Sequence, residues 1–171
     1  MEGLIFGGHY MAALRTGRVP SMIQAFDNAS MESGRTSLAP KIAEIKISVS
    51  RDRKAAREFV KESSGTRVLN MYRQGYSRED IQNLGVNLED VEKLDEADTA
   101  GVPPEVFDAL VTDDMVDAIF IAGEPGECLE RMLEVHNIAQ SQGFHQLMFS
   151  ELGPDVDEAL GLLVDEVIPS L

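Results

Sequence analysis

The stretch IAEIKISVS, residues 42–50, is the clearest β-strand in the sequence and decides the fold class. Apolar Ile45, Ile47 and Val49 alternate with polar residues, and this period of two is typical of a strand. The next stretch, RDRKAAREFVKE, has the spacing of an amphipathic helix. Either Ser50 or Asp52 is placed to cap this helix. A strand that leads directly into a helix indicates a βα unit.

Two other segments have the character of strands. LIFGG, residues 4–8, is a short apolar run that ends in two glycines. FHQLMFSEL, residues 144–152, contains three consecutive large apolar residues, which predicts burial on both faces, as in parallel sheets covered by helices. Strands that alternate with helices favour an α/β fold with parallel strands and right-handed crossovers.

Two helices near the C-terminus can be placed by their end signals and apolar spacing. Pro125 is expected in the first turn of one helix, and Gly143 follows its last turn. Pro169 ends the other helix. The residues expected on the apolar stripes are Leu129, Met132, Leu133 and His136 in the first helix, and Leu160, Leu163, Val164 and Val167 in the second. The spacing around Gly123 matches neither the P-loop nor the dinucleotide-binding fingerprint.

Between these parts, residues 63–112 hold helix-like segments separated by turn residues, without an obvious strand. We interpret them as a helical insert. Tyr72, Arg73 and Tyr76 lie in this insert, where they either contact a ligand or simply belong to the surface. The whole chain of 171 residues has the length and composition of one globular domain.

The charge of the chain limits its partners. The net charge is −15, with 13 basic and 7 acidic residues in residues 1–78 and 2 basic and 23 acidic residues in residues 79–171. Such an acidic excess works against sequence-independent binding to nucleic acid or anionic lipid. The sequence shows neither a signal peptide nor an apolar run long enough to span a membrane, so it predicts a cytoplasmic protein.

Few residues have the chemistry of a metal site or a nucleophile. Three histidines and one cysteine are scattered through the sequence without the spacing of zinc ligands, so no metal site is expected. Cys128 lies in the first turn of a helix, but the neighbouring Glu127 and Glu130 oppose a lowered thiol pKa. We therefore expect Cys128 to be a small buried residue.

The strongest candidate ligand residues follow the first expected strand. His9 would stand at the carboxyl end of a parallel strand, where α/β barrels place their ligands, and Gly7 and Gly8 would let a flat ring or a phosphate approach the backbone. A purely structural turn explains the two glycines equally well. Other polar residues at the ends of the expected strands are Ser48, Ser50, Ser150 and Glu151, and for the serines capping of the following helix is the simpler role.

Four pieces of the sequence resemble the C-terminal part of the luciferase-like family of flavin- and deazaflavin-dependent oxidoreductases. They are GLIFGG, ESGRTSLAPKIAEIKISVSRDRKAAREF, DAIFIAGEPGECLERMLEVHNIAQSQGFHQLMFSEL and GPDVDEALGLLVDEVIPSL. Their order is also that of the family. The archaeal methylenetetrahydromethanopterin reductases, which use coenzyme F-420, are the most similar branch, while flavin monooxygenases share most of these features.

The resemblance implies a partial (β/α)8 TIM barrel of about three parallel strands, 4–8, 42–50 and 144–152, with covering helices. It implies hydride transfer with coenzyme F-420, or with FMN as the alternative, to a small-molecule substrate. The implied cofactor-binding residues are Gly7, Gly8 and His9. Three strands cannot close an eight-stranded barrel, so a homo-oligomer or a complementing N-terminal half is the expected partner. Two alternatives stay open: a non-catalytic remnant or subunit that assembles through its open strand edges, and an FMN-dependent monooxygenase.

Overall fold

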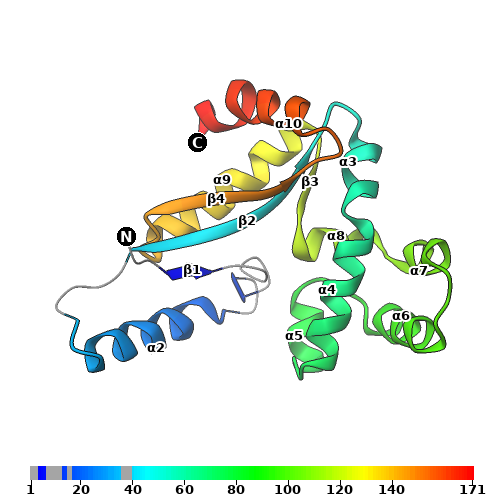
Figure 1. Cartoon of the computed structure of the whole chain (residues 1–171), viewed down its shortest axis with the longest axis horizontal. Coiled ribbons are helices and arrows are strands. Elements are labelled where there is room, and N and C mark those ends of the chain that lie inside the picture. Colours follow the sequence, from blue (N-terminus) through cyan, green and yellow to red (C-terminus); the bar gives the residue numbers. More distant parts are fainter. Residues whose placement is uncertain (1–3, 7–12, 15–16, 36–39) are drawn as a thin grey trace.

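In the computed structural model, residues 4–6, 13–14, 17–35 and 40–171 are described (Figure 1). They form one parallel sheet whose strands are β1 (Leu4–Phe6), β2 (Lys41–Val49), β3 (Ile121–Gly123) and β4 (Gln146–Leu152). All pairings in the sheet are parallel, so the three strands expected from the sequence do run in one direction. The carboxyl ends of all the strands consequently lie at the same end of the sheet.

β2 is the central strand. Along one side it pairs with the whole of β4, from Ile42 opposite Gln146 to Ser48 opposite Leu152. Its other side is shared, because β1 pairs with the start of β2 and β3 pairs with its end. The three-residue strand β3 was not expected, since so short an apolar run has no readable period.

The helices lie on the outer side of the sheet and beyond its end (Figure 1). Those around the sheet are α2 (Val19–Glu32), α9 (Pro125–Ser141) and α10 (Val156–Leu162), which continues as a π-helical turn, η1 (Leu163–Val167), and a 3-10 turn, η2 (Ile168–Ser170). The others are α3 (Arg53–Phe59), α4 (Lys61–Arg73), α5 (Arg78–Asn83), α6 (Leu88–Ala100), α7 (Pro104–Leu110) and α8 (Asp113–Ile119). The helical segment expected at residues 63–112 is therefore present.

The apolar residues gather in two cores. In the first, the buried side chains of β2 (Ala43, Ile45, Ile47 and Val49) pack against α9, α10 and η1. The second core is formed by the helices from α4 through α8 together with the residues around β3. Phe120 is the largest fully buried side chain of this core. The hydrophobic effect holds the sheet to its outer helices through the first core, and the helical segment together through the second.

Local signals in the sequence explain most helix ends. Asp52 is the N-cap of α3, where its carboxylate accepts a hydrogen bond from the Ala55 amide at 3.1 Å. Pro125 stands in the first turn of α9 as expected, and the Glu127 carboxylate accepts the Glu124 amide at 3.1 Å. Gly143 follows the helix with a φ of 77°, a conformation that suits glycine.

Three expectations about burial are wrong. β4 is not buried on both faces, because it lies at the edge of the described sheet and Met148 is 38% exposed. The buried residues of α9 are Pro125, Cys128, Met132, Val135 and Ala139, whereas Leu133 is exposed. In the C-terminal helix, Leu163 and Val167 are buried as expected, but Leu160 and Val164 face solvent. Both helices are rotated about their axes from the predicted orientation.

Candidate functional site

The face of the sheet turned away from α9 and α10 carries polar side chains, and we call it the inner face. Along β2 the apolar residues of the first core alternate with Glu44, Lys46 and Ser48, which therefore project from the inner face. Lys46 is only 6% exposed, which is rare for a lysine and requires a charged partner. The position of Lys46 thus points to an ionic cluster on this face.

That partner is a pair of carboxylates from β2 and β4. The Lys46 Nζ lies 3.4 Å from Oε1 of Glu44 and 3.2 Å from Oε1 of Glu151. The Ser150 hydroxyl donates a 2.7 Å hydrogen bond to the same Glu44 oxygen. The phenyl ring of Phe120 stands 6.0 Å from the Lys46 ammonium, at the outer limit of a cation–π contact.

A second cation joins this cluster from the helical segment. Arg67 of α4 places Nη2 3.5 Å from Oε1 of Glu151, and its Nε donates a 3.2 Å hydrogen bond to Ser63. Glu151 therefore faces both Lys46 and Arg67. We call the set Glu44, Lys46, Arg67, Ser150 and Glu151 the inner-face cluster.

Glu151 is held in this position by an unusual backbone. It has a φ of 76° and Leu152 has a φ of 62°, both in the left-handed region that non-glycine residues rarely adopt. Gly153 follows with a φ of 148°, and a Cβ placed there would stand 2.7 Å from the carbonyl oxygen of Val49. The carboxyl ends of β2 and β4 thus approach closely at a strained turn. Strain of this kind is often found at functional sites.

A pocket opens beside the inner-face cluster along α4. It is lined by Phe59, Glu62, Ser63, Thr66, Arg67 and Asn70. Phe59, the last residue of α3, is half exposed here. Arg67 belongs to both the pocket and the cluster, so the two are adjacent. A half-exposed ring surrounded by hydroxyl, amide, guanidinium and carboxylate groups has the composition of a site for a flat polar ligand.

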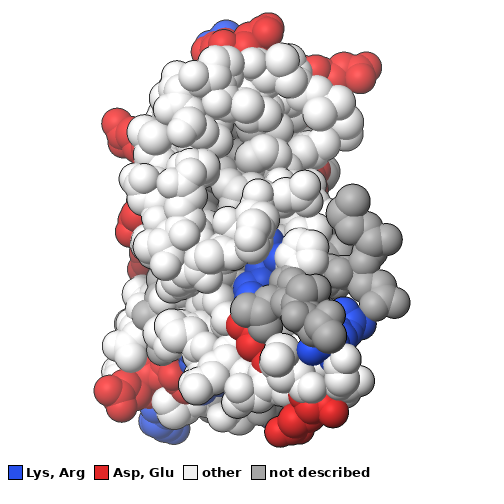
Figure 2. Space-filling view, turned by 90° about the vertical axis from the view of Figure 1, so that its left-hand side faces the viewer, with Lys and Arg blue, Asp and Glu red and all other residues white. Residues whose placement is uncertain are grey.

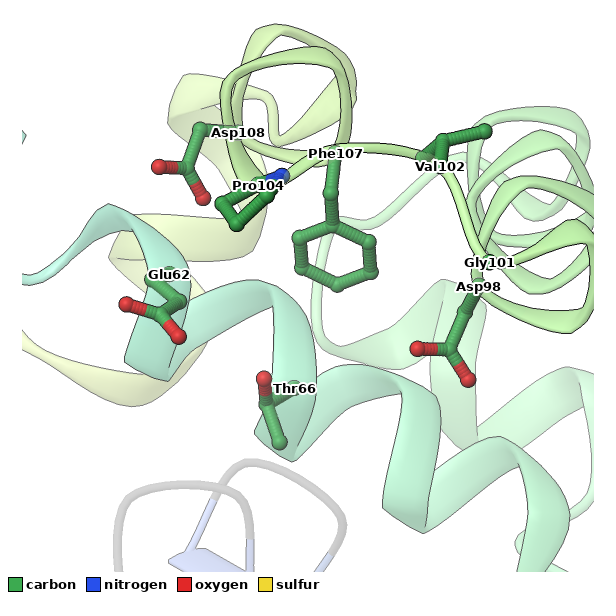
Figure 3. A pocket seen from close by; sticks show the side chains of 8 residues that line it. All are labelled: Glu62, Thr66, Asp98, Gly101, Val102, Pro104, Phe107 and Asp108. Atoms are coloured by element: carbon green, nitrogen blue, oxygen red, sulfur yellow. The ribbon is translucent and has the colours of Figure 1, made fainter.

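A second pocket lies on the far side of Thr66, between α4, α7 and the residues that follow α6 (Figure 3). The Phe107 ring stands in its centre, between the carboxylates of Glu62 and Asp108 at one end and that of Asp98 at the other. Burial, and next the charges of Glu62 and Glu58, raise the pKa of Asp108. Of the residues that the structure describes, no lysine or arginine lines this pocket, so its electrostatics oppose an anionic ligand.

The structure bears differently on each of the site residues that were predicted from the sequence. Gly7, Gly8 and His9 lie outside the described residues, so their role as cofactor ligands stays a prediction. Ser48 donates a buried hydrogen bond to the Ala56 carbonyl, and Ser50 links the end of β2 to Glu158 of α10 at 2.9 Å. These two serines are structural, although neither is the N-cap of α3.

Ser150 and Glu151, in contrast, do come together with other polar groups in the inner-face cluster. Glu44, Lys46 and Arg67 were not expected there. For Lys46 and Glu44 a signal exists in the sequence, since a lysine in the middle of a buried strand needs a carboxylate beside it. For Arg67, which comes from a distant helix, the sequence holds no such signal.

Three residues of the helical segment were possible ligand contacts, and each has a structural partner. Arg73 pairs with Asp95 and Asp98 of α6, and the hydrogen bonds to Asp98 and Asp95 raise its pKa. The guanidinium of Arg18 stacks over the ring of Tyr76 at 4.3 Å, and Tyr72 packs against the second core. These contacts support the surface role for this group.

The remaining candidates are the buried thiol of Cys128 and the metal-ligating side chains. Cys128 is fully buried, and burial raises its pKa to about 12, as expected for a packing residue. Among the described residues, no group of three or more His, Cys, Asp or Glu side chains is arranged to hold a metal ion. Within the same residues, no helix is both long and apolar enough to cross a bilayer.

A solved protein has the same fold. The coenzyme F-420-dependent tetrahydromethanopterin reductase from Methanopyrus kandleri aligns with this chain at a TM-score of 0.70 and 24% sequence identity. The alignment covers 98% of this chain and 44% of the reductase, so the chain spans less than half the length of that protein. No family model matches the sequence. The comparison confirms the partial barrel-like α/β fold that the sequence predicts.

Proposed function

We propose that this chain is the C-terminal portion of a luciferase-like oxidoreductase that binds coenzyme F-420. The observation that carries the proposal is the alignment of nearly the whole chain, parallel sheet and helical segment together, with an F-420-dependent reductase. When bound, the cofactor would supply the chemistry, which is hydride transfer between its C5 and a small carbon or nitrogen centre of the substrate.

The residues near the strand ends suit such a cofactor. The pocket along α4 offers Phe59 for stacking with a flat ring and Ser63, Thr66 and Asn70 for hydrogen bonds to its polar edge. The adjacent inner-face cluster contributes two cations, Arg67 and Lys46. These cations favour a ligand with an acidic tail. Gly7, Gly8 and His9, which follow β1 in the sequence, would contribute further contacts. The protein's part is to orient the cofactor and to exclude water.

Glu151 has a defined role in this proposal. In the free chain its carboxylate neutralises Lys46 and Arg67, and an anionic group of the cofactor would compete for the same two cations. The active form then includes a homo-oligomer or a complementing N-terminal half, which supplies the remaining strands of the barrel.

The proposal is tested by titrating the purified chain with coenzyme F-420 and, in parallel, with FMN, while the absorbance and fluorescence of the cofactor are followed. Arg67→Ala is expected to weaken binding about tenfold, since a charge-assisted hydrogen bond contributes roughly 1.5–3 kcal/mol. Glu151→Gln is expected to tighten binding, because it removes the carboxylate charge that Lys46 and Arg67 share, while Lys46 keeps its contact with Glu44. The matched control is Arg78→Ala, which removes an exposed arginine paired with Glu92.

The possible outcomes separate the alternatives. Tighter binding of FMN than of F-420 would favour the monooxygenase alternative. The same titration is repeated with the chain mixed with the unmatched part of the solved reductase. If neither cofactor binds in either case, the catalytic proposal fails and a non-catalytic subunit is the better description.

A further inference from the structure

The pocket around Phe107, between α4 and α7, joins an aromatic ring to carboxylates at both of its ends (Figure 3). Glu62 and Asp108 lie on one side of the phenyl ring, and Asp98 lies on the other. We call this site the acidic pocket. Among the described residues that line it there is no lysine or arginine, so the site favours a cationic ligand.

At the first end, Asp108 has an oxygen that is placed to accept a donor from a ligand. Its Oδ1 atom is buried from solvent and accepts no hydrogen bond from any described residue. Buried acceptors are nearly always hydrogen-bonded in folded proteins. Lys61, which follows the end of α3, pairs with Glu58 at 3.6 Å and does not take this role. Burial, and then the charge of Glu62, raise the pKa of Asp108, so the two carboxylates at this end repel each other.

At the other end, two carboxylates share one cation. Arg73 lies 2.7 Å from Oδ1 of Asp95 and 2.8 Å from Oδ2 of Asp98, which leaves one negative charge in excess. Gly101, which ends α6, also lines the acidic pocket, and the last turn of α6 holds no basic residue. The partial negative charge at the C-terminus of a helix adds to the attraction of a cation.

The surroundings of the acidic pocket attract cations over a longer range. Residues 88–117, which include α6 and α7, contain eleven acidic residues and a single lysine. Figure 1 shows α6 and α7 on the right-hand side of the molecule. Figure 2 shows the opposite side, which is largely uncharged and carries Lys and Arg beside its Asp and Glu. The excess of negative charge on α6 and α7 draws a cation toward the acidic pocket.

The arrangement of the carboxylates selects the kind of cation. A metal ion needs ligands that converge on one point, and within the described residues no group of three or more His, Cys, Asp or Glu is arranged in this way. In the acidic pocket the carboxylates stand on two sides of the Phe107 ring. Two ammonium groups joined by an alkyl chain match this pattern, because each end takes one charge and the chain lies against the ring.

We propose that the acidic pocket binds an aliphatic diamine or polyamine. One ammonium group donates hydrogen bonds to Asp108 and Glu62, and a second pairs with Asp98. The methylene chain between them packs on Phe107. This binding goes beyond the proposed function and does not depend on it. The acidic pocket shares Glu62 and Thr66 with the pocket along α4, so the amine lies beside the proposed cofactor.

The test is a calorimetric titration of the full chain at constant ionic strength. The probes are the linear diaminoalkanes from diaminopropane to diaminooctane, each compared with the monoamine of the same chain length. The best diamine is expected to bind at least tenfold more tightly than its monoamine, because it makes a second contact with a carboxylate. The affinity is expected to peak at one chain length, because the two ends of the pocket are held at a fixed separation.

Two variants report on the two ends of the acidic pocket. Asp108→Asn is expected to weaken the diamine and the monoamine alike, by about tenfold. Asp98→Asn is expected to reduce the affinity of the diamine to that of the monoamine and to leave the monoamine unchanged. The matched control is Glu96→Gln, which removes the same charge from the exposed side of α6 outside the pocket. Thermal unfolding without ligand checks that each variant folds.

Three results would overturn the proposal. Equal affinities for diamines and monoamines would point instead to the lysine side chain of a partner protein. Displacement of the diamine by magnesium chloride, but not by sodium chloride of the same ionic strength, would point to a metal site. Equal losses of affinity in Asp108→Asn and Glu96→Gln would show that only the overall charge attracts the amine.

Failure of this site and failure of the proposed function can be told apart, because no cofactor enters the amine titration. A chain that binds the diamine through Asp98 and Asp108 but binds neither coenzyme F-420 nor FMN would refute the proposed function alone. A chain that binds coenzyme F-420 and no diamine would refute the amine site alone.

Discussion

Lys46 of β2 lies with its Nζ 3.2 Å from Oε1 of Glu151, and this contact joins the middle of the sheet to the left-handed turn at the end of β4. Lys46 is almost fully buried, whereas Glu151 is about one third exposed. The ion pair is therefore half protected from solvent, and loss of the lysine leaves two carboxylates, Glu44 and Glu151, close together without their cation.

The first prediction concerns this pair. Lys46→Met is expected to lower the free energy of unfolding by about 2 kcal/mol at pH 7, because it leaves uncompensated charge in a largely buried place. Lys93→Met, which removes a lysine from an exposed pair with Asp90, is expected to cost less than about 0.5 kcal/mol. Urea unfolding measures both. In the background of Glu151→Gln, the cost of Lys46→Met should fall, and an unchanged cost would contradict coupling between the two residues.

The second prediction concerns the turn that carries Glu151. Gly153→Ala is expected to destabilise the fold by about 2–3 kcal/mol, because alanine is strained at a φ of 148° and its Cβ would press on the Val49 carbonyl. Gly161→Ala is the matched control. Gly161 lies inside α10 with open space around it, so alanine there should stabilise the helix by roughly 0.5–1 kcal/mol. Opposite signs are expected in thermal unfolding, and equal effects would argue against the turn geometry.

The third prediction concerns the junction between α3 and α8. Arg57 is buried and donates hydrogen bonds to Asp113, Asp117 and the Ala122 carbonyl. Burial alone would lower the pKa of Arg57, but the hydrogen bonds to Asp117 and Asp113 raise it above its ordinary value. Arg57→Lys is expected to cost about 2 kcal/mol, because a lysine cannot reproduce the planar fork of donors.

The control for this junction is Arg53→Lys, in which the exposed pair with Glu127 is altered. Its cost is expected to stay below about 0.5 kcal/mol in the same denaturant experiment. Similar costs for the two variants would show that Arg57 does not hold the junction together.

The fourth prediction concerns pH and Asp108, in the acidic pocket of Figure 3. The pKa of Asp108 is raised in the folded chain, mainly by burial. As the pH rises, the unfolded chain releases this proton at a lower pH than the folded chain does. The free energy of unfolding therefore falls between the ordinary carboxyl pKa and the raised one. Asp108→Asn is expected to be more stable than the parent at pH 7, by less than about 1 kcal/mol because the carboxyl group is only partly buried.

This advantage should shrink as the pH falls and vanish below the ordinary pKa of an aspartate. Thermal unfolding between pH 3 and pH 8 measures it, with Glu96→Gln on the exposed side of α6 as the control. An advantage that does not change with pH would show that the charge of Asp108 is not its origin.

The outcome for the strands shows what the sequence can predict here. The alternation in β2 is strong because one of its faces is covered by α9 and α10, so its position was predicted to within one residue. β3 escaped prediction because three residues carry no period. The apolar run in β4 suggested two covered faces, but burial of an edge strand depends on neighbours that its own residues do not specify.

The candidate site was predictable only in part. Ser150 and Glu151 were placed correctly at the end of a strand, because that position follows from the strand assignment alone. Lys46 and Arg67 come from a strand and a helix that are distant in sequence, and only the packing of α4 brings Arg67 to Glu151. The rotation of the C-terminal helix was equally hidden, because apolar residues occur on two of its faces and the spacing does not tell which is buried.

The fifth prediction concerns Cys128, whose thiol is fully buried at the start of α9. Burial, opposed by the charge of Arg131, raises its pKa to about 12, so almost no thiolate exists at pH 8. In the folded chain, an excess of a thiol reagent is expected to modify Cys128 at least a hundredfold more slowly than in urea. The rate should follow the fraction of unfolded chain, and Gly153→Ala should increase it in proportion to the stability lost. Rapid modification of the native chain, independent of urea, would show that the first core opens around α9 without unfolding.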